Sequence, residues 1–207
     1  SLLRDDPAFD FKLIVTGSHL SPEYGFTYRE IEKDGFKPEF KIEMLLSSDS
    51  SIGIAKSMGL CMIGIADALE KISPDCILVL GDRYELLSIC STALVMKIPI
   101  VHISGGDVTT GAIDNEIRNA ISQMADFHFP STQASAKQLI EMGIPENKIM
   151  VVGEPGLDNF NRLSLLNREE VAKELDLDQH KKWILLTYHP ETKINTAENI
   201  HILKDLI

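Results

Sequence analysis

Cys76-Ile-Leu-Val-Leu-Gly81-Asp82-Arg83 is the stretch of this chain that decides its fold class. Its apolar run, Cys76–Leu80, is short and bounded by turn residues, which is typical of a strand buried on both faces of a parallel sheet. A second run of this kind, Ile98–Ile103, leads into His102-Ile-Ser-Gly-Gly-Asp107. Open α/β sheets bind their ligands at the carboxyl ends of the strands, so the polar residues after both runs predict a site.

Strand-like runs alternate with helical patterns along most of the chain. The predicted strands are Phe11–Thr16, Lys41–Leu46, Cys76–Leu80, Ile98–Ile103, Phe127–Pro130 and Ile149–Val152. The predicted helices are Ser51–Ile72, Tyr84–Met96, Asp114–Met124 and Ser131–Met142. Alternation of this kind predicts the α/β class, with a Rossmann-like, doubly wound parallel sheet.

The pattern changes after residue 156. Leu157–His180 is polar and helical, and a further strand is predicted at Trp183–Thr187, followed by a helix over Asn195–Ile207. We therefore expect an N-terminal Rossmann-like domain over residues 1–165. Residues 166–207 are expected to hold a linker helix and the beginning of a second, C-terminal nucleotide-binding Rossmann-like domain, so that the chain is a fragment.

The composition and net charge of the chain make some classes of binding partner unfavourable. The 207 residues are 44% hydrophobic and carry a net charge of −11, from 20 basic and 31 acidic side chains. This balance disfavours nucleic acids and anionic membranes, which need a basic surface. We find no apolar run of about 18 residues and no signal peptide. The three cysteines lie in apolar contexts without CxxC spacing, which indicates reduced thiols in a cytoplasmic protein and no metal site.

Carboxylates follow the two central strands. Asp82 alone is equally compatible with a cap of the next helix, because Gly-Asp before a helix is a common turn. The segment from Asp107 to Arg118 is harder to explain structurally, and Asp114 and Arg118 share one face of its helix. Paired carboxylates on neighbouring loops suit acid/base catalysis, because repulsion and partial burial raise the pKa of one of them.

The histidines divide by position. His102 lies inside a strand, where a satisfied core histidine is the usual case, and His128 between two phenylalanines is more typical still of a structural residue. His19 and His189 each follow a strand, where they can reach a ligand. The glycines form neither GxGxxG nor a P-loop motif, so neither a dinucleotide nor a P-loop nucleotide is indicated.

Taken together, the motifs resemble the hydrolysing UDP-N-acetylglucosamine 2-epimerase family of sialic and legionaminic acid-type sugar biosynthesis. The resemblance covers nearly the whole chain. The motifs on which the resemblance rests are Thr16-Gly-Ser-His-Leu20, Tyr24-Gly-Phe-Thr-Tyr28, Ser57-Met-Gly-Leu60, Gly81-Asp-Arg83, His102-Ile-Ser-Gly-Gly-Asp107, Gly111-Ala-Ile-Asp114 with Arg118, and His189-Pro190.

This resemblance implies the N-terminal domain of a GT-B-type architecture with UDP held in an interdomain cleft. The implied substrate is UDP-N-acetylglucosamine or its 2,4-diacetamido-trideoxy analogue, and no metal or other cofactor is required. The C2 proton is removed, UDP leaves by anti elimination, and hydration of a glycal-like intermediate gives the free 2-epimeric sugar. The family also implies a homodimer or homotetramer, an opening strand before Ser1 and diphosphate loops after Ile207.

The resemblance also implies roles for individual residues. Asp82 and Asp114 are similar to catalytic carboxylates of the family, and Arg83 and His189 to nucleotide contacts. The other positions that are expected to bind the substrate are His19, His102, Ser104 and Arg118. Ser104 stands where many relatives have glutamate, and Asp107 is expected to take over that residue's part in proton transfer.

Other functions remain open from the sequence. A non-hydrolysing 2-epimerase has the same fold but returns an intact nucleotide sugar. A GT-B glycosyltransferase needs an acceptor and leaves C2 unchanged. An inactive UDP-sugar-binding homologue binds without turnover.

Overall fold

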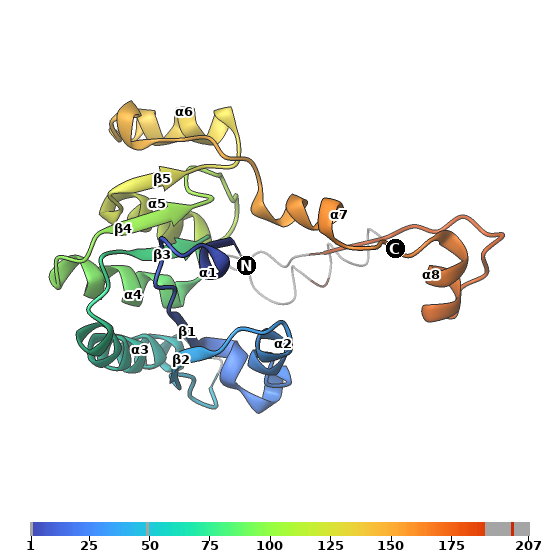
Figure 1. Cartoon of the computed structure of the whole chain (residues 1–207), viewed down its shortest axis with the longest axis horizontal. Coiled ribbons are helices and arrows are strands. Elements are labelled where there is room, and N and C mark those ends of the chain that lie inside the picture. The colour runs from blue at the N-terminus through green and yellow to red at the C-terminus, as the bar shows by residue number, and fades with distance from the viewer. Residues whose placement is uncertain (1, 49, 189–199, 201–207) are drawn as a thin grey trace.

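The computed structural model describes residues 2–48, 50–188 and 200 (Figure 1). Its strands are β1 (Leu13–Thr16), β2 (Pro38–Ile42), β3 (Ile77–Leu80), β4 (Ile100–Ile103) and β5 (Phe127–Phe129). Its α-helices are α1 (Leu2–Asp5), α2 (Tyr28–Lys33), α3 (Ser51–Ile72), α4 (Tyr84–Val95), α5 (Asp114–Met124), α6 (Gln133–Glu141), α7 (Asn159–Arg162) and α8 (Arg168–Glu174). Short 3-10 turns are η1 (Gly17–Leu20), η2 (Pro22–Tyr24), η3 (Glu146–Lys148) and η4 (Pro155–Asp158).

All strand pairs of the described residues are parallel, as predicted, but they form two sheets instead of one. β1 pairs with β2, and β3, β4 and β5 form the second sheet in that order (Figure 1). In the second sheet, Ile77 lies opposite Ile100 and His102 opposite His128. β1 and β3 share no ladder among these residues, so the parallel strands are divided between two sheets.

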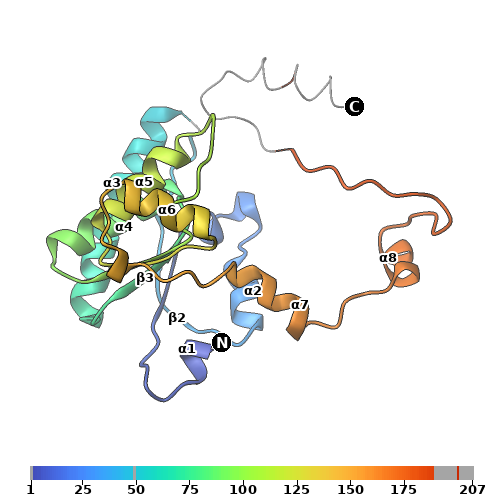
Figure 2. The same cartoon turned by 90° about the horizontal axis from the view of Figure 1, so that it is seen from above.

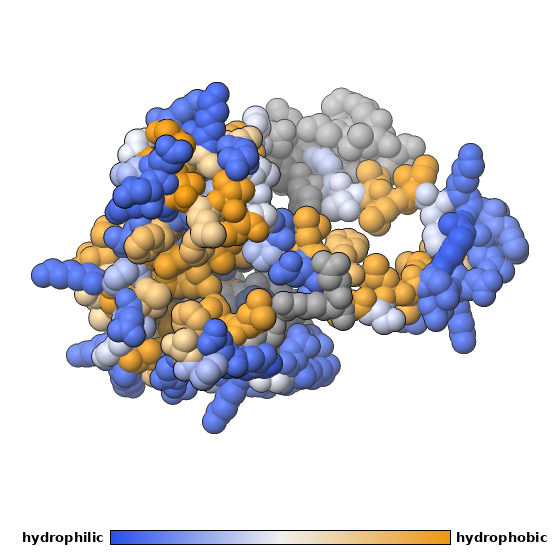
Figure 3. All heavy atoms as spheres, turned by 45° about the horizontal axis from the view of Figure 1, so that its top comes forward, coloured by the Kyte–Doolittle hydropathy of each residue, from blue (hydrophilic) through white to orange (hydrophobic). Residues whose placement is uncertain are grey.

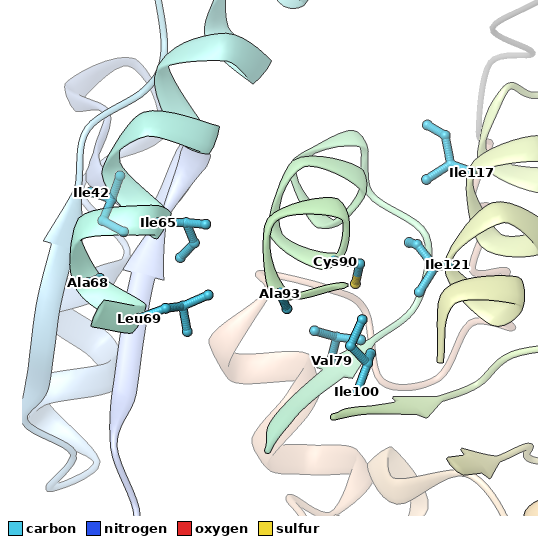
Figure 4. Packing of buried hydrophobic residues seen from close by; sticks show 10 residues of the cluster. All are labelled: Ile42, Ile65, Ala68, Leu69, Val79, Cys90, Ala93, Ile100, Ile117 and Ile121. Carbon is cyan, nitrogen blue, oxygen red and sulfur yellow. The ribbon is translucent and has the colours of Figure 1, made fainter. Parts of the chain in front are cut away.

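Helices α3, α4 and α5 join the two sheets through one apolar core. Ser50 begins α3 by accepting a hydrogen bond from the backbone N–H of Gly53, a standard N-cap. Ile65 and Leu69 of α3, each 1% exposed, point toward α4 (Figure 4). The cluster consists of Ile42, Ile65, Ala68, Leu69, Val79, Cys90, Ala93, Ile100, Ile117 and Ile121. Side-chain packing, rather than backbone pairing, thus connects β2 to β3.

Helix α3 is long and apolar enough to cross a membrane, by length and composition alone. One face of it nevertheless packs in the core, where Cys61 is 0% and Ile65 1% exposed. A core helix passes the same length and hydropathy test, so the packing accounts for the composition of this face.

Strand β3 departs from the expectation of burial on both faces. Val79 is 7% exposed and packs against α4, whereas Leu78 and Leu80 on the opposite face are 46% and 55% exposed. Successive side chains of a strand point to opposite faces, so only the α4 side of β3 is covered by the described residues.

The predicted strand at 149–152 is present only in part. Ile149 forms an isolated parallel bridge with His128, and the N–H groups of Met150 and Val152 donate to the carbonyls of His128 and Pro130. These bonds extend the second sheet beyond β5, although residues 149–152 form no assigned strand.

The predicted strand Trp183–Thr187 is wrong. These residues are irregular, with Ile184 91% and Leu185 94% exposed, since no described strand lies beside them to pair with. Trp183 instead stacks under the guanidinium of Arg168, 4.0 Å from its ring centre. Helix α8 lies apart from the sheets in both views (Figures 1 and 2), and its surface is hydrophilic (Figure 3). The helix predicted over Asn195–Ile207 falls almost entirely outside the described residues.

Candidate active site at the carboxyl edge of β3 and β4

The polar residues singled out in the sequence gather where β3 and β4 end. Gly81 turns the chain directly after β3 with a φ of 83°, in the left-handed region that favours glycine, and Asp82 follows it. Ser104 follows β4, and its own φ of 59° places a non-glycine residue in that region. Parallel strands end at the same edge, so the loops after β3 and β4 meet there.

Arg118 is the centre of this cluster. It lies on α5, is only 8% exposed, and its Nη2 donates to the Asp82 carboxylate. Its Nη1 donates to the backbone oxygen of Asp107 at 2.8 Å and to Thr109 Oγ1 at 2.9 Å. One guanidinium therefore ties the loop after β3 to the loop after β4.

Asp82 and Asp114 form the predicted carboxylate pair. Burial raises the pKa of Asp82, the nearby charge of Asp114 raises it further, and the positive charge of Arg118 opposes both effects. Asp114 begins α5 one helical turn before Arg118, so the two residues lie on the same face of the helix. The alternative in which Asp82 caps α4 is wrong, because Arg83 is the N-cap residue and no side chain caps this helix.

Asp107 joins the cluster by its backbone. Its carboxylate accepts a hydrogen bond from Ser135 of α6, while its carbonyl faces Arg118. Gly106 allows this close approach, because a Cβ at this position would lie 2.2 Å from the backbone oxygen of Ser135. The structure thus brings Asp82 and Asp114 together and turns the Asp107 side chain toward α6.

Two of the predicted substrate contacts are buried. His102 is 0% exposed, with Nε2 2.9 Å from the Gly81 carbonyl oxygen and Nδ1 3.1 Å from Ser122 Oγ. The Nη1 and Nη2 donors of Arg118 are likewise directed to protein atoms, as described above. Both side chains are buried among protein groups in this structure, and the expectation that His102 and Arg118 touch the substrate stays a prediction.

The other predicted contacts within the described residues follow strands and are at least partly exposed. The Arg83 side chain is 62% exposed and pairs with Glu85 at 3.0 Å. His19 is exposed in η1, where its Nδ1 lies 2.8 Å from Thr27 Oγ1. Ser104 Oγ lies 3.3 Å from Ser131 Oγ. His189 lies outside the described residues.

Glu85 and Glu154 are site residues that the sequence analysis did not single out. Glu85 is 5% exposed, and a Cβ on Gly17 would lie 2.6 Å from its Oε1, so this carboxylate bridges the loop after β1 to α4. Glu154 accepts from Ser131 Oγ at 2.9 Å, beside Ser104. A glycine directly after β1 was the available signal for Glu85, whereas nothing in the sequence distinguished Glu154.

Metal ligation has no evident basis in this cluster. Within residues 2–48, 50–188 and 200, no group of three or more histidine, cysteine, aspartate or glutamate side chains is arranged to hold a metal ion. The chemistry available at this edge is proton transfer by carboxylates and hydrogen bonding from exposed arginine, histidine and serine.

Comparison with known proteins shows the family of this chain. A family model described as UDP-N-acetylglucosamine 2-epimerase matches residues 1–207. The chain belongs to the UDP-N-acetylglucosamine 2-epimerase family. The sequence resemblance on which the site was predicted is thereby confirmed.

Two members of this epimerase family illustrate the similarity. A Campylobacter jejuni protein named GDP/UDP-N,N'-diacetylbacillosamine 2-epimerase (hydrolyzing) is 42% identical over 205 residues, covering 99% of this chain and 53% of the relative. A Legionella pneumophila protein named UDP-N,N'-diacetylbacillosamine 2-epimerase (hydrolyzing) is 37% identical over 188 residues, covering 91% and 50%. The chain therefore spans about half the length of the curated relatives it matches.

A solved structure of the family confirms the fold class. The UDP-GlcNAc 2-epimerase of Neisseria meningitidis, crystallised with UDP-GlcNAc, aligns with a TM-score of 0.69 at 22% identity, over 83% of this chain and 44% of that one. The Rossmann-like α/β class with parallel strands, as in the N-terminal part of a GT-B architecture, is thus established for this epimerase-family chain.

Proposed function

We propose that the protein carrying this chain is a hydrolysing 2-epimerase that converts a UDP-linked 2-acetamido sugar into the free 2-epimeric sugar and UDP. The observation that carries the proposal is the 42% identity, over 99% of this chain, to a relative named as a hydrolysing 2-epimerase. Since both relatives described above are named for UDP-N,N'-diacetylbacillosamine, we favour the 2,4-diacetamido-trideoxy sugar over UDP-N-acetylglucosamine as substrate.

The proposed reaction has two stages. A base takes the proton from C2 while the C1–O bond breaks, and UDP leaves with the bonding electrons, so that a C1–C2 double bond remains. Water then adds its oxygen to C1, and a proton returns to C2 from the other face. Neither stage needs a nicotinamide, because no electrons are transferred to another molecule.

The carboxylates at the sheet edge suit these proton transfers. Burial makes the Asp82 carboxylate more basic, and its contact with Arg118 holds it in one orientation. The charge of Asp114 contributes to the raised pKa of Asp82. We assign proton transfer at C2 and at the intermediate to this pair, with Asp107 assisting.

The exposed residues of the same edge supply binding contacts in this proposal. Arg83 faces solvent beside Asp82 and suits a phosphate oxygen, and His189 is proposed to contact the nucleotide from a second domain that begins after residue 165. His19 and Ser104 lie at strand ends on the sugar side. The exposed Glu154 carboxylate, beside Ser104, is placed to accept a hydrogen bond from an amide N–H such as a C4 acetamido group.

The decisive experiment follows UDP-N,N'-diacetylbacillosamine and UDP-N-acetylglucosamine by NMR in deuterated water with the protein that carries this chain. Free epimeric sugar with deuterium at C2, together with UDP, supports the proposal. An intact UDP-sugar epimer establishes the non-hydrolysing reaction instead, and binding without turnover establishes the inactive homologue.

Variants test the assignment of the carboxylates. We expect Asp82→Asn and Asp114→Asn each to lower kcat by about a hundredfold or more, because proton transfer by a positioned group contributes that much. Glu141→Gln, on the exposed surface of α6, is the matched control. Unchanged turnover of Asp107→Asn contradicts the part assigned to Asp107.

We further propose that the protein is a cytoplasmic homo-oligomer in the supply of a sialic or legionaminic acid-type sugar. Three unpaired cysteines suit a reducing compartment. For the oligomer, α3 and α4 leave an apolar groove of about 360 Å³ between Met58, Met62 and Leu87. A two-fold axis through such a face buries the same apolar surface on both copies, and a stable dimer buries about 800 Å² on each.

The oligomer proposal is tested by sedimentation. Met62→Glu, at the groove, is expected to shift the protein toward monomer, whereas Met150→Glu, 65% exposed elsewhere, leaves the assembly unchanged. A monomeric wild type contradicts the proposal, and so does a wild type that binds vesicles through this face instead.

A further inference from the structure

The buried imidazole of His102 connects three parts of the site that are distant in the sequence. Its ring accounts for two hydrogen bonds, to the Gly81 carbonyl at 2.9 Å and to Ser122 Oγ at 3.1 Å. Gly105 packs over the second bond, because a Cβ there would lie 2.9 Å from both His102 Nδ1 and Ser122 Oγ. The β3 turn, helix α5 and the loop after β4 therefore meet at one ring.

The partners fix the tautomer of this ring. A carbonyl oxygen only accepts hydrogen bonds, so Nε2 must carry the hydrogen that is donated to Gly81. Nδ1 is then the acceptor and receives the hydroxyl hydrogen of Ser122. Burial, together with nearby His128 and Arg118, lowers the pKa of His102 to about 4, which keeps the ring in this neutral form at neutral pH.

Both bonds act on the groups that hold the Asp82 carboxylate. The Gly81 carbonyl belongs to the peptide unit that enters Asp82, so the bond from His102 sets the direction in which Asp82 leaves the strand. Ser122 lies one helical turn beyond Arg118 on α5, and Arg118 donates to Asp82. The ring thus fixes the Asp82 backbone and the helix that carries its ionic partner.

We propose that His102 is a positioning residue that holds Asp82 and Arg118 in their reactive arrangement through its bonds to Gly81 and Ser122. The inference rests on the proposed function for its kinetic consequence, and on the structure alone for the tautomer. Because the ring has no exposed surface, it acts through these groups and does not touch the substrate.

Two substitutions separate positioning from simple packing. The amide nitrogen of glutamine in His102→Gln lies near the place of Nε2 and can still donate to Gly81. The amide of asparagine in His102→Asn lies near the place of Nδ1, so it can meet Ser122 but not Gly81. We expect His102→Asn to lower kcat about a hundredfold with little change in KM, since small misplacements of a catalytic group cost this much, and His102→Gln to retain most of kcat. Equal losses in both variants overturn the proposal.

A second measurement does not depend on turnover. Long-range proton–nitrogen NMR of the protein is expected to show His102 as a neutral Nε2–H ring that does not titrate between pH 5 and 8. A ring protonated at Nδ1, or one that titrates near 6.5, overturns the proposal even if the enzyme is active. If the wild type turns over neither UDP-sugar, the proposed function fails while this measurement still decides the positioning role.

Discussion

Replacing Arg118 by methionine tests whether one buried guanidinium holds the site together. Methionine keeps much of the apolar stem but removes every donor. The Asp82 carboxylate, 22% exposed, then loses its ionic partner, whose own side chain is 10% exposed. The carbonyl of Asp107 and the hydroxyl of Thr109 lose a hydrogen bond each.

The loss of unfolding free energy in Arg118→Met can be worked out from these contacts. Removing one partner of a buried ion pair costs about 3–5 kcal/mol, and the partial exposure of Asp82 places this pair near 3 kcal/mol. The two lost hydrogen bonds add about 1 kcal/mol each. Arg118 Nε has no hydrogen-bond partner within the described residues, so its removal recovers about 2 kcal/mol. The net loss of unfolding free energy is about 3 kcal/mol.

Urea denaturation measures this loss. With a denaturant slope of about 2 kcal/mol per molar, the midpoint of Arg118→Met is expected about 1.5 M below that of the wild type. Lys137→Met is the matched control, because its 3.6 Å pair with Glu141 is exposed on α6 and is worth at most about 0.5 kcal/mol.

Two results refute the reasoning. The first is a midpoint of Arg118→Met no lower than that of Lys137→Met. The second comes from a double-mutant cycle with Asp82→Asn, in which the cost of Arg118→Met is expected to fall by about 2 kcal/mol. If the stability losses of the two single variants simply add in the double variant, the pair with Asp82 contributes nothing to stability.

Three further outcomes are expected. Because the pKa of His102 falls from 6.5 to about 4 on folding, the unfolded chain binds the extra proton between these values, so the wild type loses stability as the pH falls through this window. His102→Gln, compared in urea at pH 7 and 4.5, is expected to remove up to about 2.5 kcal/mol of that loss, and an unchanged pH dependence refutes the assignment. Gly81→Ala meets no atom within 4 Å and costs about 1 kcal/mol of backbone strain, whereas Gly106→Ala also collides with the backbone of α6 and is expected to cost more; equal denaturation midpoints contradict this order. A thiol reagent at pH 8 is expected to label only the exposed Cys76 in the folded protein and all three cysteines in urea, and mass spectrometry that finds a second label without urea contradicts the burial of the other two.

Local signals predicted the helices, and the carboxyl edge of β3 and β4 stays the predicted position of the site. The structure has α3 at Ser51–Ile72 and α5 at Asp114–Met124, as the sequence predicted, because caps and apolar spacing act within a few residues. The carboxyl edge of β3 and β4 was predicted because parallel strands share one edge, and Asp82 and Asp114 meet there.

The sequence could not predict features that depend on distant neighbours. Trp183–Thr187 has the composition of a strand but no described partner strand, so its backbone stays irregular. The burial of His102 and Arg118 among protein groups was not predicted, because sequence position places a residue near an edge without telling which way its side chain turns. The packing of α5 against the loops after β3 and β4 decides that direction.

The parallel pairing of β3, β4 and β5 also bears on how the site forms during folding. Each strand pairs with one that follows it only after an intervening helix, as Ile77 with Ile100 and Val101 with Phe127, so no hairpin can nucleate this sheet. The bond between Arg118 and Asp82 closes a loop of 36 residues. Because the entropy of loop closure is lost before such contacts add stability, the contact between Arg118 and Asp82 is expected to form late in folding, and a partly folded chain is expected to lack the proposed site.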